Sequence, residues 1–399
     1  MTQTTPTRTT PTRTTSSPSA LERAIDPVAP EQFLEEYWER KPLVVPRAEE
    51  GRFDDLLSLR DVERLVTETG LRTPAFRLVQ AGESPSGYTT DLAWRPEAFT
   101  GVADVRRVAA EFAAGATIVL QGLHYLWLPL ARYCRHLEAY LGSPVQANAY
   151  YTPRGSQGLP VHHDTHEVIT LQIAGEKRWL VYEPALELPL KNQRYRTALG
   201  GPGEPVLDVT ARAGDTLYLP RGWLHQALTS DADSLHITVG VNVRRWIDEA
   251  RAALDEQEDE LAFRQAIDRE HAPALPVLDA ERVRERARER FVLSRRPVLD
   301  GQLAELRELG ELSGETELVR RDTVIADLHG TTLVFEGQRL RFPERLAPEL
   351  EFLVTADGPF TAAQLPGALD EEGRLVLVRK LVREGFLRRA GQRRTVSAA

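Results

Sequence analysis

The stretch Pro160-Val-His-His-Asp-Thr-His-Glu167, followed by the β-rich run 168–173, carries the residues from which fold and function can be argued. Successive side chains of an extended strand point to opposite faces, so we expect His162, Asp164 and His166 to share one face. A His-x-Asp pair sets an imidazole nitrogen beside a carboxylate oxygen. A distant histidine would complete the two-histidine, one-carboxylate triad of non-haem Fe(II) oxygenases. The pair alone is weak evidence, because two polar residues on the surface of a strand give the same pattern.

Two histidines could complete such a triad. His225 follows a strand and a Pro/Gly turn in Leu219-Pro-Arg-Gly-Trp-Leu-His225, whereas His236 lies inside the expected strand 234–241. A turn at the end of a strand can aim a side chain into the mouth of a barrel, while a histidine within a strand is more often hydrogen-bonded inward. We therefore favour His225 as the third ligand and keep His236 as the alternative.

Lysine is rare in this chain, because only four of the 50 basic residues are lysines. Lys177 follows Asp164 by thirteen residues, beyond Gly175. A barrel that chelates iron through a 2-oxo acid needs a cation for the far carboxylate, and lysine can serve as a compact point charge. The alternative is a solvated lysine at a hairpin tip. Asn148 and Tyr150 alternate along one expected strand and could face the same cavity, although Tyr150 could equally be a core aromatic residue.

Short strand-like runs surround this segment, with glycine and proline residues between them. They span residues 117–121, 145–151, 168–173, 178–182, 215–219 and 234–241. Several short strands at turn-bounded intervals are typical of a small β-barrel or sandwich. The middle of the chain is therefore expected to be β-rich.

The flanking segments differ from the middle in composition. Residues 1–20 contain Thr-Thr-Pro-Thr-Arg twice in tandem, which predicts a disordered tail. Apolar spacing predicts a helix over 31–40, and the charge-dense stretch 248–290 also favours helix. The last segment has the order of a winged helix, with a short helix, a longer helix and a strand at residues 360–367, 374–383 and 386–389.

Composition limits the possible classes of function. The 399 residues carry a formal net charge of −9, from 59 acidic and 50 basic side chains, so a whole-chain basic footprint for nucleic acid is absent. A single cysteine, Cys134, excludes an internal disulfide framework and any cysteine-based metal cluster. No stretch approaches the roughly 20 apolar residues of a membrane helix. We expect a cytoplasmic protein with no membrane partner and no general affinity for nucleic acid.

Together these residues resemble the JmjC-type ribosomal oxygenases, a family of Fe(II)- and 2-oxoglutarate-dependent protein hydroxylases. The likeness runs from about Leu21 to Arg394 and rests on several motifs. They are Phe33-Leu-Glu-Glu-Tyr-Trp-Glu-Arg-Lys-Pro-Leu-Val-Val45, Gly115-Ala-Thr-Ile-Val-Leu-Gln-Gly-Leu-His124, Asn148-Ala-Tyr-Tyr-Thr-Pro-Arg-Gly-Ser-Gln-Gly158, His162-His-Asp164, Leu171-Gln-Ile-Ala-Gly-Glu-Lys-Arg-Trp179 and Gly214-Asp-Thr-Leu-Tyr-Leu-Pro-Arg-Gly-Trp-Leu-His225. Departures from the family pattern occur at Gly240, where some relatives carry serine, at His163, and over residues 268–273.

The resemblance implies an α+β fold built on a double-stranded β-helix (cupin/JmjC) barrel, with N-terminal helices, a helical dimerisation region and a C-terminal winged helix. After the tail at 1–20 we expect a catalytic domain at 21–245, a dimerisation region at 246–312 and a winged-helix domain at 313–394.

The resemblance also implies the site residues and cofactors. His162, Asp164 and His225 would hold Fe(II), with 2-oxoglutarate and O₂ as co-substrates. Lys177 would pair with the distal carboxylate of 2-oxoglutarate. The remaining pocket residues would be Tyr150, Asn148 and Thr238.

A protein substrate follows from the same resemblance, namely an arginine or histidine of a large-subunit ribosomal protein, together with a homodimeric enzyme. An acidic chain would attract a basic ribosomal protein. One alternative is hydroxylation of a peptide or small metabolite in biosynthesis. Another, from a different class, is a ligand-sensing barrel whose winged helix binds DNA. Its phosphate contacts would come from the basic end formed by Arg388, Arg389, Arg393 and Arg394. Histone-type demethylation fits the same chemistry, but the sequence offers no chromatin reader.

Overall fold

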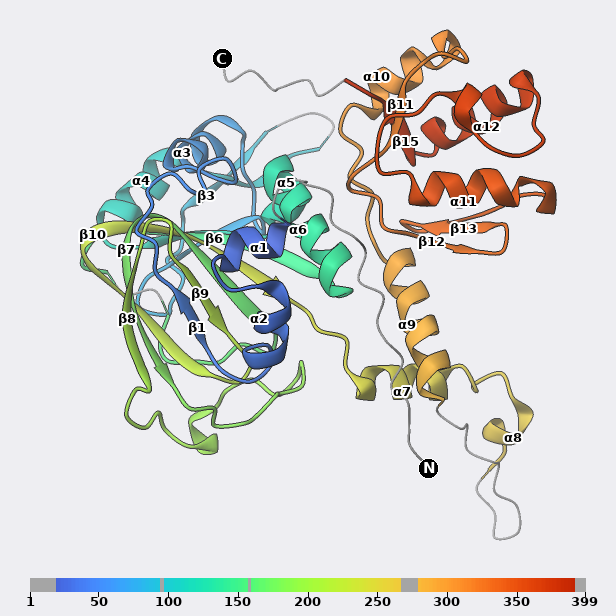
Figure 1. Ribbon diagram of the computed structural model, residues 1–399. Helices are drawn as coiled ribbons and strands as arrows, with labels where there is room; N and C mark the ends of the chain where they lie inside the picture. The colour runs from blue at the N-terminus through green and yellow to red at the C-terminus, as the bar shows by residue number, and fades with distance from the viewer. Residues whose placement is uncertain (1–18, 94–96, 157–158, 267–278, 392–399) are drawn as a thin grey trace.

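A computed structural model describes residues 19–93, 97–156, 159–266 and 279–391 (Figure 1). The tail expected at 1–20 lies outside the described residues except for Ser19 and Ala20, and so do Gln157, Gly158 and the linker at 268–273. Along the chain, a barrel with helices packed on it comes first, a helical stretch follows, and a mixed helix and strand unit comes last (Figure 1).

The N-terminal helices are short and end where the backbone turns. The first elements are α1 (Ala20–Ile25), α2 (Pro30–Glu36) and β1 (Leu43–Val45). A capping box starts α1, in which Ser19 and Glu22 satisfy each other's backbone N–H groups. The helix predicted over 31–40 ends four residues early, because the backbone leaves helical geometry and Glu39 adopts a φ of 58°.

The segment before the central strands contains more structure than the sequence pattern predicts. Its elements are α3 (Leu59–Glu68), β2 (Phe76–Val79), β3 (Thr89–Leu92), β4 (Phe99–Ala103), α4 (Val105–Ala113), β5 (Thr117–Leu120), α5 (Leu123–Leu126) and α6 (Leu128–Leu141). β5 confirms the strand predicted at 117–121, whereas β3 and β4 form a separate hairpin. α6 packs against α1 and against the strand that follows it.

An eight-stranded antiparallel sheet forms the barrel. Its order is β1-β9-β7-β10-β6-β5-β2, and β8 pairs with β7. The elements not yet introduced are β6 (Val145–Thr152), β7 (Glu167–Tyr182), β8 (Leu207–Arg212), β9 (Thr216–Leu219) and β10 (Leu224–Val241). The runs predicted at 168–173 and 178–182 are two halves of the single strand β7, and β10 begins ten residues before the strand predicted at 234–241.

Both long strands, β7 and β10, bend and so fold the sheet over on itself. β7 passes through Gly175 with a φ of 63°, and a Cβ at this position would lie 1.7 Å from the Asp233 carbonyl oxygen on β10. The register between β7 and β10 shifts next to this point. As a result, Lys177 in the second half of β7 faces the same cavity as Thr170 in the first half.

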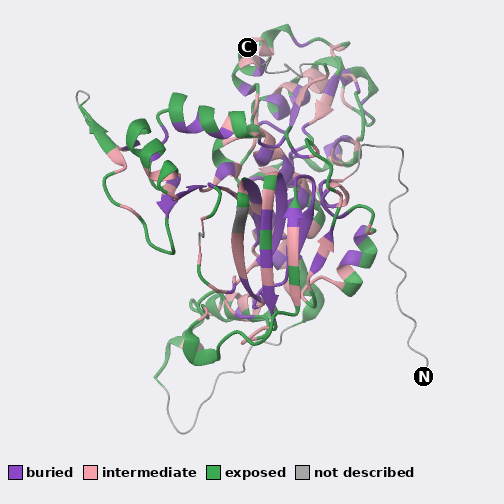
Figure 2. Ribbon diagram, turned by 90° about the vertical axis from the view of Figure 1, so that its left-hand side faces the viewer, coloured by how far each residue is buried: buried purple, intermediate pink, exposed green. Residues whose placement is uncertain are grey.

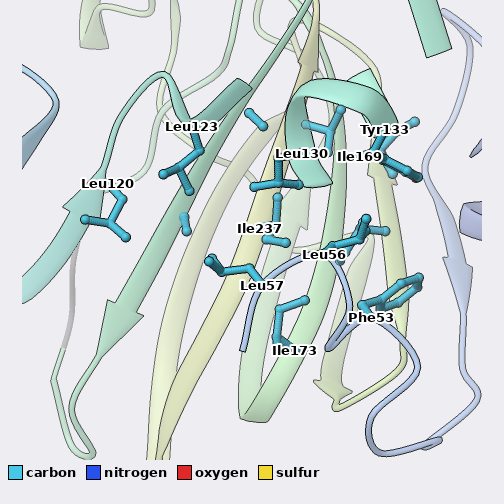
Figure 3. Close-up of a cluster of buried hydrophobic side chains, with 14 of the residues drawn as sticks. Phe53, Leu56, Leu57, Leu120, Leu123, Leu130, Tyr133, Ile169, Ile173 and Ile237 are labelled. Carbon is cyan, nitrogen blue, oxygen red and sulfur yellow. The ribbon is translucent and has the colours of Figure 1, made fainter. Parts of the chain in front are cut away.

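Alternation along the strands separates an apolar outer face from the cavity inside the barrel. Ile169 and Ile173 of β7 and Ile237 of β10 point outward and join a buried cluster with α6 and residues 53–57 (Figure 3). Each such side chain contributes roughly 1.5–3 kcal/mol when it is fully buried. The alternate positions Val168 and Thr170 line the cavity instead. Figure 2 shows these central strands as a largely buried layer between more exposed helices.

The remaining chain is first helical and then mixed. Its elements include α7 (Trp246–Asp255), α8 (Leu261–Arg264), α9 (Ala280–Leu293), α10 (Gln302–Arg307), β11 (Leu318–Arg320), β12 (Ala326–His329), β13 (Thr332–Phe335), β14 (Gln338–Arg341), α11 (Ala347–Thr355), α12 (Glu371–Arg383) and β15 (Leu387–Arg389). α12 and β15 match the elements predicted at 374–383 and 386–389, whereas 360–367 contains only a 3₁₀ turn. The winged helix and the dimerisation region stay predictions. No helix in the described ranges is both long and apolar enough to span a membrane.

A buried ionic cluster fastens the C-terminal unit to the barrel. Arg135 of α6 donates to the Thr323 carbonyl oxygen (2.9 Å) and pairs with Glu336 in the turn between β13 and β14. Glu138 bonds to Arg135 (2.9 Å) and accepts from the Val145 N–H at the start of β6 (3.0 Å). Because these groups are buried, removing one partner would leave an uncompensated charge.

The geometry at Gly175 predicts that a single methyl group destabilises the barrel. In Gly175→Ala the folded state must hold an alanine at a left-handed φ, which costs about 1–2 kcal/mol. Its methyl group would also clash with β10. Gly142→Ala is the matched control, since Gly142 has a φ of 62° but nothing within 4 Å of its Cβ position. We expect the midpoint of thermal unfolding to fall further for Gly175→Ala. Equal shifts in the two variants would contradict the bend described for β7.

Candidate metal centre

Three side chains from separate parts of the chain converge at one end of the barrel. One ligand atom from each of His162, Asp164 and His225 lies within 4.8 Å of the other two. The Nε2 atom of His225 is 3.7 Å from the Asp164 carboxylate, and the two imidazole rings are 4.4 Å apart. No other such trio of histidine, cysteine or acidic side chains occurs among the residues that the structure describes. The arrangement matches the two-histidine, one-carboxylate geometry of the facial triad.

The segment that carries His162 and Asp164 is a loop, so the prediction that an extended strand aligns these residues is wrong. β7 begins only at Glu167. His162 and His225 exchange backbone hydrogen bonds of 3.1 and 2.8 Å, and the Gly222 N–H donates to the Asp164 carbonyl oxygen at 3.0 Å. These cross-links between two segments, rather than strand alternation, bring the three side chains together.

Backbone carbonyls fix the tautomers of both histidines. Nδ1 of His162 lies 2.8 Å from the Pro160 carbonyl oxygen, and Nδ1 of His225 lies 3.0 Å from that of Trp223. A carbonyl oxygen can only accept, so each Nδ1 carries the proton and each Nε2 keeps its lone pair. Metal-binding histidines show the same arrangement.

Electrostatics favour the metal-binding protonation states of His225 and Asp164. Burial, together with the neighbouring His162, lowers the pKa of His225 to about 4, so its ring is neutral near pH 7. Burial alone would raise the pKa of Asp164, but the surrounding histidines, led by His166, bring it below its ordinary value. A neutral imidazole at His225 and a carboxylate at Asp164 result, and both are ligands suited to a divalent cation.

A cavity extends from the trio into the barrel and ends at a buried lysine. Lys177 is 2% exposed, and its ammonium donates to Thr152 Oγ1 (3.2 Å), which lies 3.2 Å from Thr117 Oγ1. Burial lowers the pKa of Lys177 to about 8, so the side chain is still mainly cationic at neutral pH. No described carboxylate lies within ion-pair distance of this ammonium. The cavity therefore offers an unneutralised cation at its inner end.

Further polar groups in the cavity wall lack partners within the protein. The Trp179 indole N–H and the Thr170 hydroxyl are both buried without a hydrogen-bond partner, and both residues line the cavity. Buried polar groups in folded proteins are normally satisfied. Together with Lys177, these donors suit a small ligand that carries carboxylate oxygens.

The structure shows which of the other candidate residues line the cavity. Tyr150 and Thr238 line the cavity, as does His236, whose ring stacks on Tyr150 with centroids 5.0 Å apart. His236 is not part of the trio, so the geometry agrees with the choice of His225 as third ligand. Asn148 does not line the cavity but accepts a hydrogen bond from the Gly122 N–H (2.9 Å).

Sequence reasoning missed Thr117, Thr152, Thr170 and Trp179 in the cavity wall. A signal was available for two of them. Thr152 continues the alternation that begins with Asn148 and Tyr150, and Trp179 lies two residues beyond Lys177 on the same strand.

Comparison with known proteins shows which proteins the segment around this site resembles. Residues 124–248 match the family model of the JmjC domain. "Bifunctional lysine-specific demethylase and histidyl-hydroxylase NO66" of Drosophila persimilis is 34% identical over 223 residues, which cover 55% of this chain and 31% of that protein. "Ribosomal oxygenase 2" of Bos taurus is 34% identical over 235 residues, covering 56% and 48%. The chain thus spans a third to a half of the length of these relatives.

Solved structures extend the likeness in fold. The "Crystal structure of Escherichia coli ribosomal oxygenase YcfD" aligns with a TM-score of 0.52 at 17% identity, over 91% of this chain and 98% of that one. A YcfD structure in complex with cobalt and 2-oxoglutarate aligns with a TM-score of 0.51 at 18% identity, over 90% and 98%. The likeness confirms the JmjC/cupin fold expected from the sequence.

The trio predicts one divalent cation per chain. We expect Co(II) or Mn(II) to bind the metal-free chain in equimolar ratio, and Asp164→Ala to abolish this binding because it removes the only anionic ligand. His163→Gln is the control, since buried His163 contacts the Gln193 carbonyl oxygen (2.9 Å) instead. Calorimetric titration measures the stoichiometry and the dissociation constant of the cation for the unaltered chain and for both variants. Undiminished binding by Asp164→Ala would show that the cation sits elsewhere.

Proposed function

We propose that this chain, whose residues 124–248 form a JmjC domain, is an Fe(II)- and 2-oxoglutarate-dependent oxygenase that hydroxylates a protein side chain. One observation carries the proposal. A metal-binding trio and an unneutralised buried lysine share one cavity inside a barrel. An Fe(II) centre with a dicarboxylate co-substrate requires both features, and a simple ligand-binding barrel requires neither.

The chain's own residues account for binding and orientation. His162, Asp164 and His225 would hold Fe(II), which supplies O₂ activation coupled to decarboxylation of 2-oxoglutarate when it is bound. Lys177 and Thr152 bind the distal carboxylate. The Trp179 N–H and the Thr170 hydroxyl, which have no partner in the protein, would be available to hydrogen-bond the rest of the co-substrate. These last residues were not in the set implied by the resemblance.

Apolar residues complete the pocket. Val79, Val119, Val168 and Ala227 line the same cavity as the lysine and the trio. They exclude water from the reacting centre and lower the local dielectric, which strengthens the charge pairing at Lys177. Tyr150, with its pKa raised to about 12 by burial, stays protonated and can act as a hydrogen-bond donor.

We further propose that the substrate is an arginine or histidine of a large-subunit ribosomal protein. The names of the relatives, ribosomal oxygenase and histidyl-hydroxylase, support this substrate class. The net charge of −9 favours a basic partner over an acidic one. Such a substrate would place the reaction in the cytoplasm. The DNA-binding alternative is weakened at one of its four arginines, because Arg389 bonds to Glu308 Oε2 at 2.6 Å.

A homodimer is part of the same proposal. α7 and α8 expose Trp246 (60%), Leu254 (48%) and Leu261 (70%). Exposed apolar residues gathered on neighbouring helices are typical of protein contact surfaces. Sedimentation analysis of the full chain measures its mass directly.

The pKa of Lys177 makes the affinity for 2-oxoglutarate depend on pH. Only the ammonium pairs with a carboxylate, and the free protein loses this proton at a pH of about 8. The affinity for 2-oxoglutarate should therefore fall as the pH rises from 7 to 9. Lys177→Arg keeps its charge over this range, so its affinity should be nearly constant. Parallel pH profiles for the two proteins would contradict the role of Lys177.

The substrate class can be tested by mass spectrometry. Ribosomal proteins incubated with the chain, Fe(II), ascorbate and 2-oxoglutarate should include one large-subunit protein that gains the mass of a single oxygen atom on arginine or histidine. His162→Ala is the inactive control, and free basic peptides test whether the folded substrate is needed. Turnover of 2-oxoglutarate with a small metabolite but with no ribosomal protein would favour the biosynthetic alternative.

A further inference from the structure

A cluster of four side chains, three of them buried, joins the segments that carry the proposed metal ligands. It consists of Glu39, Glu167, Tyr218 and Arg221, and we call it the rear cluster. Arg221 is 5% exposed, and its Nη1 donates to Glu167 Oε1 (3.1 Å) and to Glu39 Oε1. The Tyr218 hydroxyl donates to Glu167 Oε2 (2.6 Å) and accepts from the Glu39 N–H (2.9 Å). One guanidinium therefore lies between two carboxylates, with a tyrosine closing the network.

The rear cluster cannot touch the metal itself. Glu167 is the first residue of β7, and its neighbour Val168 lines the cavity. Side chains alternate along the strand, so Glu167 points to the opposite side, away from the cavity. It is fully buried there. Any effect of the cluster on the metal must pass through the backbone segments that carry the ligands.

Those segments are the ones that the cluster joins. Glu167 follows the loop with His162 and Asp164 by three residues, and Arg221 precedes His225 by four. The Arg221–Glu167 pair therefore ties together the two segments that also exchange backbone hydrogen bonds. The next residue, Gly222, donates its N–H to the Asp164 carbonyl oxygen (3.0 Å). Side-chain and backbone contacts thus fix the same two segments from different directions.

N-terminal residues cover the rear cluster. Tyr218 of β9 stacks on Trp38 with centroids 5.9 Å apart and meets Phe33 edge to face at 4.8 Å. Glu39 adopts its left-handed φ where its side chain and its backbone N–H both reach the cluster. The aromatic cover limits access of water, which strengthens the ion pairs beneath it.

From these contacts we infer that Glu167, Tyr218 and Arg221 are positioning residues for the metal centre, held in place by the N-terminal segment 33–39. They set the separation of Asp164 and His225 before a metal binds. The inference rests on the proposed function, because it assigns these residues to the trio that would hold Fe(II). Outer partners of this kind typically change metal affinity by about 10- to 100-fold.

Titration of the metal-free, full-length chain with Co(II) tests the inference. Glu167→Gln keeps the shape of the side chain but removes the charge that pairs with Arg221. We expect the Co(II) dissociation constant to rise at least about tenfold, with a changed Co(II) absorption spectrum that reports altered ligand geometry. Tyr218→Phe, which removes only a hydroxyl, should raise the dissociation constant by a smaller factor and guards against a Glu167→Gln variant that fails to fold.

Glu336→Gln is the matched control. Glu336 is also a buried carboxyl paired with a buried arginine, Arg135, but it fastens the C-terminal unit rather than the ligand segments. This variant should lower the thermal unfolding midpoint and leave the Co(II) dissociation constant and spectrum unchanged.

The outcomes separate the inference from the proposed function. Wild-type Co(II) affinity in both Glu167→Gln and Tyr218→Phe would overturn the positioning role while the metal centre stands. An equal loss of affinity in Glu336→Gln would also overturn it, because the effect would then follow from general destabilisation. Absence of Co(II) binding by the unaltered chain would instead overturn the proposed function, and the inference with it.

Discussion

The reciprocal backbone hydrogen bonds between His162 and His225 are the contact on which the site depends. They hold together a loop and a strand that are far apart in the sequence, and they place two imidazoles and one carboxylate within reach of a single cation. Since neither segment could form this geometry alone, the barrel must first bring β7 and β10 side by side. Antiparallel pairing along both halves of the two strands does this, and at the bend the register shifts where β7 passes Gly175, two residues before Lys177.

The cavity holds metal-binding groups in one part and a cation in another. Two imidazoles and one carboxylate line one part of the cavity, while an ammonium and hydroxyl groups line another. A ligand that is anionic at one end and chelating at the other would satisfy both parts. Without such a ligand, Lys177, Trp179 and Thr170 keep hydrogen-bonding capacity that the protein does not use, which costs folding stability. This cost is reasonable only if the groups are there to bind something.

Sequence reasoning reached the trio, the lysine and the barrel, because residue type and spacing carry that information directly. It failed where the geometry depends on partners distant in the chain. The segment 161–166 was expected to be extended, with alternating side chains, but it pairs with a single residue of β10 and does not extend the sheet. Asn148 has the alternation of a cavity residue, yet the Gly122 N–H takes up its side-chain oxygen. The rear cluster was also hidden, because its members come from three separate parts of the chain: Glu167 lies 51 residues before Tyr218, and Glu39 lies 182 residues before Arg221.

The central claim is that one cavity holds both a metal on the trio and a dicarboxylate on Lys177. Anomalous diffraction from crystals grown with Mn(II) and 2-oxoglutarate measures both at once. The account predicts a single anomalous peak bonded to Nε2 of His162, the Asp164 carboxylate and Nε2 of His225, with the distal carboxylate of 2-oxoglutarate on Lys177 and Thr152. A peak at another position, or a co-substrate whose carboxylate avoids Lys177, would contradict it.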